Sequence, residues 1–127
     1  MSWLNYISES EQKRRKLEQI FAGREPFDDQ KLWKIYFEQY GVAPETVVRI
    51  RQILTEILEA DLSRIRDTDD FSKELALFWE FDSLADVEVV QEIEKRFGIA
   101  ITDEEAVAMK TLKDIVLGVH AKIPKSA

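Results

Sequence analysis

The stretch DSLADVEVVQEIEKRFGIAITDEEA, residues 82–106, places apolar side chains at three- and four-residue spacing after an Asp-Ser pair. This rhythm predicts an amphipathic helix from Ser83 to about residue 97. An apolar stripe of this kind packs against the core of a domain, so we expect its members to be buried. The positions that keep the rhythm are Val87, Val90, Ile93 or Glu94, and Phe97.

The rest of the sequence also has helical periodicity, and we predict an all-α fold. No alternating run of β-branched residues is long enough to favour a sheet. Residues 61–75 form a polar stretch that we expect to be a loop, held to the core by Leu62, Ile65, Phe71 and Leu75. Further helices are predicted over residues 9–22, 29–40, 45–60, 103–108 and 111–122.

Two aromatic segments allow alternative interpretations. In the first, residues 30–40, packing into the protein's own core is favoured over a partner surface for Trp33, Tyr36, Phe37 and Tyr40. The second, ALFWEF at residues 76–81, lies just before Ser83. Packing under the N-terminal helices is favoured over an exposed patch beside the functional group for Phe78, Trp79 and Phe81.

Composition excludes several classes of chemistry. With no cysteine and one histidine, the chain offers no disulfide framework, no thiolate metal site and few parts for zinc binding. No apolar run approaches the roughly 18 residues of a membrane span, and the first residues lack the order of a secretory signal. We therefore predict a cytoplasmic protein that does not contact membranes.

Negative charge is concentrated in the middle of the chain. Residues 61–109 hold 14 acidic and 5 basic side chains, which should repel phosphate backbones and attract basic protein surfaces. The basic run KRRK at residues 13–16 stands among glutamates, and a solvated helix face is favoured over a nucleic-acid contact. We predict no nucleic-acid partner.

Ser83 by itself has ordinary explanations. In a Ser-x-x-Asp pattern its hydroxyl can cap the following helix, or Asp82 can be the cap and leave that hydroxyl free. A hydrolytic nucleophile is disfavoured, because the single histidine, His120, lies near the end of a different helix and no Gly-x-Ser-x-Gly elbow is present.

The stretch as a whole resembles the acyl carrier protein family. The likeness begins at Asp-Ser-Leu, residues 82–84, and continues to Ile-x-Asp-Glu-Glu-Ala at residues 101–106. It extends more loosely from about Val47 to about Ile123. The resemblance implies an acyl-carrier-like four-helix bundle over residues 45–127, with an added N-terminal helical segment over residues 1–44. Between its two ends, the likeness is carried by Val87, Glu88, Val90, Ile93, Glu94 and Phe97.

The resemblance also implies a cofactor. Ser83, flanked by Asp82 and Leu84, would receive a 4'-phosphopantetheine arm from coenzyme A through a phosphopantetheinyl transferase. The arm's thiol would then hold acyl or aminoacyl intermediates as thioesters for a biosynthetic pathway, such as fatty acid or polyketide synthesis. In that role the protein is not an enzyme. The alternative is a carrier-fold interaction or regulatory module that is not phosphopantetheinylated.

The same resemblance implies a docking face around the serine. We expect Leu84 to contact partners there, together with acidic side chains. Acidic side chains around the serine would meet basic patches on the transferase and on acyl-loading and acyl-using enzymes. Lys95 and Arg96 depart from the family's pattern, because they stand where an acidic run usually continues. The expected acidic docking residues are Glu80, Asp86, Glu88 and Glu92.

Overall fold

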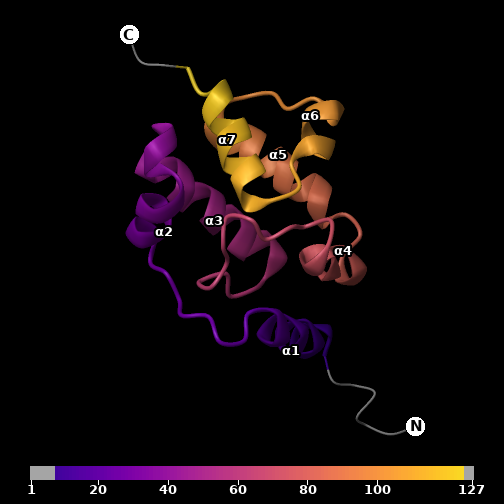
Figure 1. Cartoon of the computed structure of the whole chain (residues 1–127). Helices are drawn as coiled ribbons and strands as arrows, with labels where there is room; N and C mark the ends of the chain where they lie inside the picture. Colours follow the sequence, from indigo (N-terminus) through magenta and orange to yellow (C-terminus); the bar gives the residue numbers. More distant parts are fainter. Residues whose placement is uncertain (1–7, 125–127) are drawn as a thin grey trace, which may run out of the picture.

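The computed structural model describes residues 8–124, and this part of the chain is built from helices without a strand (Figure 1). The predicted all-α class is confirmed. Two 3-10 helices, η2 (Glu38–Tyr40) and η3 (Glu74–Ala76), accompany the α-helices. The α-helices are α1 (Glu9–Ile20), α2 (Asp29–Tyr36), α3 (Pro44–Leu58), α4 (Leu77–Phe81), α5 (Ala85–Phe97), α6 (Asp103–Ala108) and α7 (Leu112–Lys122). None of them is long and apolar enough to cross a membrane.

Helix α3 is the central element of the core. It begins with Pro44, whose fixed φ suits the first turn of a helix, and it packs against α2, α5 and α7. Its apolar side chains recur every three or four residues, so one broad stripe is buried among the neighbouring helices. The buried apolar residues of this helix are Val47, Ile50, Ile53, Leu54 and Leu58.

Helix α5 is turned differently from our prediction. It begins at Ala85, two residues after Ser83, and its buried positions are Ala85, Val89 and Ile93. Val87, predicted to be buried, is 48% exposed, and Val90 is only half-buried. The residues from 87 to 90 include three valines, so two different stripes fit a helical period, and contact with α3 selects the stripe with four-residue spacing.

The loop between α3 and α4 is anchored as predicted, because Leu62, Ile65, Phe71 and Leu75 are all buried. A buried acid that the sequence did not reveal adds to this anchoring. Asp69 is 3% exposed and accepts two hydrogen bonds from the Arg24 guanidinium, at 2.7 and 3.1 Å. A third comes from the backbone N–H of Arg66, at 2.7 Å. These contacts tie the segment between α1 and α2 to the loop.

Replacing Asp69 with asparagine should lower the free energy of unfolding by about 1.5–3 kcal/mol, because the amide lacks the negative charge and has only one of the two acceptor oxygens that Arg24 and the Arg66 N–H use. Urea denaturation followed by circular dichroism would measure the change. Asp67→Asn is the matched control in the same loop, since its carboxylate accepts no hydrogen bond from the described residues. Equal losses in both variants would contradict a specific role for the Asp69 pair.

The N-terminal segment shares one buried core with the rest of the protein. Phe21 and Phe37 are completely buried, and α1 packs against α4 on the side of the bundle away from α6 and α7 (Figure 1). Residues 1–7 lie outside the described part of the chain. The division of the chain at residue 44 stays a prediction, although residues on both sides of it contribute to the same apolar cluster.

The aromatic segments pack largely as favoured. In residues 30–40, Phe37 is buried, Trp33 and Tyr36 are half-buried against the core, and Tyr40 is exposed. The ALFWEF segment forms the end of η3 and all of α4. Helix α4 packs against α1 of the N-terminal segment. Within it Phe78 is buried, the half-buried Trp79 donates its Nε1–H to Phe71 O at 2.8 Å, and Lys16 Nζ lies 5.5 Å from the ring of Phe81.

Candidate functional site

Ser83 stands in the turn that joins α4 to α5. Its side chain is exposed, and its hydroxyl forms no hydrogen bond with the described residues. Asp82 shapes this turn instead: its Oδ1 accepts the N–H of Leu84 at 3.0 Å, and its carbonyl oxygen accepts the N–H of Ala85 at 3.2 Å. The serine hydroxyl is thus free, as in the alternative to a serine cap, but Asp82 is not the cap of α5, because the N-cap residue is Leu84 and Ser83 precedes the helix.

The predicted capping box at Ser83 is not formed. The N-cap of α5 is Leu84, and no side chain accepts a hydrogen bond there. Asp86, which would complete the box, accepts the N–H of its own neighbour Val87 at 2.8 Å. Two true capping boxes occur further on, at Thr102 with Glu105 and at Thr111 with Asp114. Helix capping therefore does not account for the serine at position 83.

The start of α5 favours an anion. Its first backbone N–H groups and the positive end of the helix dipole lie beside Ser83, and α5 is a 13-residue helix. A phosphodiester on the serine oxygen would be compatible with this position, because the exposed side chain leaves room for a bulky group. No group of three or more metal-ligating side chains comes together in residues 8–124.

The acidic residues around Ser83 divide into two kinds. Glu80 lies 3.4 Å from Lys16 of α1, and Glu92 lies 2.7 Å from Arg96 one turn along α5. Asp86 and Glu88 have no ion-pair partner among residues 8–124. Two of the four predicted docking acids thus have an ion-pair partner within the chain, and the two without one, Asp86 and Glu88, lie in the first turn of α5.

Arg96 also reaches beyond α5, because its guanidinium donates to Glu56 of α3 at 2.8 Å. Hydrogen bonds to Glu92 and then to Glu56 raise the pKa of Arg96 above its usual value. Of the two basic residues that depart from the family's pattern, Arg96 therefore has two partners within the chain.

The basic run at residues 13–16 is likewise engaged within the protein. Lys13 Nζ donates to the carbonyl oxygen of Leu58 at 2.6 Å, and Arg14 and Arg15 both pair with Glu11. Lys16 completes the set through Glu80. These contacts support a structural role for the run.

Exposed apolar side chains also lie near the serine, at Leu84 and along the facing sides of α5 and α6. Leu84 is 64% exposed and Val87 is 48% exposed, and Val107 of α6, at 73%, was not singled out by the sequence. Val87 and Val107 line a groove of about 330 Å³ between α5 and α6. Beneath it is a smaller cavity of about 70 Å³, whose lining includes Leu54, Trp79, Val90 and Met109.

Comparison with known proteins gives a family match for the central and C-terminal parts of the chain. A family model described as the phosphopantetheine attachment site matches residues 48–117, which include Ser83 and the whole of α4, α5 and α6. Helices α1 and α2 lie outside the matched residues.

Three curated proteins named acyl carrier protein are similar to this chain. The protein from Helicobacter hepaticus is 34% identical over 77 residues, which are 61% of this chain and 96% of the relative. That from Thermosynechococcus vestitus is 29% identical over 79 residues, 62% of this chain and 93% of the relative. That from Cylindrotheca sp. is 33% identical over 79 residues, 62% of this chain and 94% of the relative.

Proposed function

This chain belongs to the acyl carrier protein family, and we propose that Ser83 is the attachment residue for its covalent 4'-phosphopantetheine group. The observation that supports this assignment is the exposed hydroxyl of Ser83 just before α5, which forms no hydrogen bond within residues 8–124. When bound, the group supplies a thiol that holds an acyl group as a thioester. Since the chain has no cysteine, that thiol would be the only one in the protein.

The residues around Ser83 would prepare it for modification. The hydrogen bond from Leu84 N–H to Asp82 Oδ1 fixes the turn, and this keeps the serine in front of the first turn of α5. The helix start would favour the phosphodiester after transfer. No described side chain forms a hydrogen bond with the serine, so a base that accepts its proton would have to come from the transferase.

The proposed cargo is an acyl or aminoacyl intermediate of a biosynthetic pathway, with fatty acid or polyketide synthesis as the leading classes. The proposed partners are a phosphopantetheinyl transferase and enzymes that load or use the acyl group. Leu84 would provide an apolar contact for them, and the unpaired carboxylates Asp86 and Glu88 would meet their basic patches. We also propose that the protein is located in the cytoplasm.

Intact-mass measurement tests the proposed function. The full chain is incubated with coenzyme A and each of several broad-specificity transferases, and we expect the mass of one phosphopantetheinyl group to be added. Peptide mapping should place it in the segment that contains Ser83. No addition with any of the transferases would overturn the proposal. An unmodified Ser83 in protein purified from its own cells would instead favour a regulatory module of the same fold.

Charge reversal at Asp86 and Glu88 tests the docking face. The double variant Asp86→Lys with Glu88→Lys should lower kcat/KM of the transferase about tenfold at low ionic strength, because it removes the long-range attraction that speeds encounter. The loss should shrink as salt screens the charges. Glu38→Lys with Glu45→Lys makes the same change in net charge at exposed positions elsewhere. An equal loss in this control would show an effect of net charge alone.

A further inference from the structure

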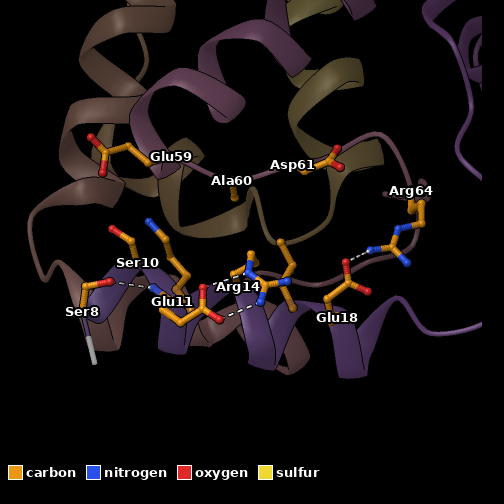
Figure 2. Close-up of a pocket in the computed structure, with 11 residues that line it drawn as sticks. Ser8, Ser10, Glu11, Arg14, Glu18, Glu59, Ala60, Asp61 and Arg64 are labelled. Atoms are coloured by element: carbon orange, nitrogen blue, oxygen red, sulfur yellow. Dashed lines mark hydrogen bonds and ion pairs between the residues drawn. The ribbon is translucent and has the colours of Figure 1, made fainter. Parts of the chain in front are cut away.

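Two adjoining cavities lie along the contact between α1 and the C-terminal end of α3. The larger, of about 430 Å³, is lined by α1 and by residues 59–64, and Figure 2 shows the two walls facing each other. The smaller, of about 300 Å³, is enclosed by α1, the end of α3, α4 and the start of α5. Ser10, Lys13 and Glu59 line both cavities, so the two adjoin at these residues, and we call them together the groove. Lys13 Nζ donates to Leu58 O across this junction, at 2.6 Å.

One end of this groove reaches the proposed attachment site. Asp82 and Ala85, which flank the Ser83-Leu84 turn, line the smaller cavity. Polar groups on the same walls include Glu9, Lys13 and Glu88, which offer hydrogen-bond acceptors and a donor for the amides of a pantetheine chain. The apolar part of this wall is made by Ile57, Leu58, Phe78 and Phe81.

The far end of the groove suits an uncharged aliphatic group. Leu17 and Ala60 give it an apolar lining. Four of the charged residues around them form two ion pairs: Arg14 lies 2.6 Å from Glu11 and Arg64 lies 2.6 Å from Glu18, as the dashed lines in Figure 2 show. Glu59 and Asp61 on the facing wall form no ion pair within residues 8–124. The hydrogen bond from Arg14 holds the pKa of Glu11 at about 2, so this pair stays ionised at neutral pH.

Helix α1 makes this groove a feature of the present chain. It supplies a wall of both cavities and lies outside the residues 48–117 that the family model matches. The cavities also have the size of small-molecule sites, which span roughly 300–1,000 Å³. The cavity beneath α5 and α6 is much smaller, at about 70 Å³.

We propose that the groove between α1 and α3 receives the phosphopantetheine arm and shelters a short, uncharged acyl group on its thiol. The arm would enter beside Asp82 and Ala85, pass Ser10 and Lys13, and place the acyl group against Leu17 and Ala60. This inference rests on Ser83 being the attachment residue. It assigns the N-terminal helix a role in protecting the cargo.

Reactivity of the arm's thiol tests the proposal, because the chain itself contains no cysteine. The holo-protein, verified by intact mass, is treated with iodoacetamide, and its alkylation rate is compared with that of two variants. Ser10→Trp fills the junction of the two cavities from an exposed position of α1. Gln19→Trp is the matched control on the same helix, at an exposed position that lines neither cavity.

We expect the wild-type and Gln19→Trp proteins to react roughly fivefold more slowly than Ser10→Trp, as for an arm that is seated about four-fifths of the time. Equal rates in all three proteins would overturn the proposal. If the protein gains no phosphopantetheinyl mass, the proposed function is overturned and not the proposed groove. The intact-mass measurement shows this before alkylation begins.

Amide chemical shifts of the wild-type protein give a second test that does not depend on the variants folding. Octanoyl-phosphopantetheine is installed from octanoyl-coenzyme A, and the spectra of apo-protein and octanoyl-protein are compared. We expect the largest changes at Lys13, Leu17 and Ala60. Changes confined to Val90 and Met109, which line the cavity beneath α5 and α6, would overturn the proposal.

Discussion

Ser83→Ala should abolish attachment of the phosphopantetheine group and leave the fold intact. The primary hydroxyl of Ser83 is the proposed nucleophile, and alanine offers no atom that can form the phosphodiester. Intact mass after incubation with coenzyme A and a broad-specificity transferase would show the loss. Ser72→Ala, at another exposed serine, is the control and should gain the full phosphopantetheinyl mass.

The stability of Ser83→Ala separates modification from helix capping. Because the Ser83 hydroxyl is exposed and forms no hydrogen bond with the described residues, the free energy of unfolding should change by no more than about 0.5 kcal/mol. A loss near 1 kcal/mol, typical of a removed N-cap, would show that the hydroxyl supports α5 after all. Retained phosphopantetheinyl mass in Ser83→Ala would move the attachment to a different residue.

Phe21→Ala should lower the free energy of unfolding of the whole protein by about 3–5 kcal/mol, because a fully buried aromatic ring is replaced by a cavity. The ring follows α1 and lies beneath the guanidinium groups of Arg24 and Arg64, at 5.1 and 5.9 Å. Urea denaturation would measure the loss. Ile35→Ala is the control: its side chain is 48% exposed, and it should cost less than about 1 kcal/mol.

The same variant bears on the predicted boundary at residue 44. If residues before it form part of the carrier's core, hydrogen exchange should become faster in α3 and α5 when Phe21 is truncated. Exchange that changes only in α1 and α2 would indicate a separately folded extension. A loss of 3–5 kcal/mol would remove a large share of the roughly 5–15 kcal/mol that stabilises a typical domain.

The pair of the half-buried Arg24 with the buried Asp69 illustrates what sequence patterns miss. The two residues are 45 positions apart, and neither follows a helical period that would mark it as buried. The contact between Lys16 and Glu80, 64 positions apart, escaped prediction for the same reason, although it removes one of the predicted docking acids from the unpaired set. Such pairs arise only when distant segments are brought together.

The sequence predicted helix α5 correctly in part: its position but not its buried face. The sequence predicted the helix and its end near Phe97 correctly, because a strong apolar period and a following glycine are local signals. It predicted the wrong face for Val87, because three valines within four residues fit two stripes. Packing of Ala85, Val89 and Ile93 toward α3 resolved that ambiguity.

The sequence by itself determined the all-α class, most helix positions and the family resemblance around Ser83, because these depend on short-range periodicity and on residues that are neighbours in the chain. Tertiary structure decided which acids remain unpaired, which side of α5 faces solvent and where α1 lies beside the serine. Each of these depends on side chains that meet across large separations, and their contacts are selected by the free energy of packing the whole chain.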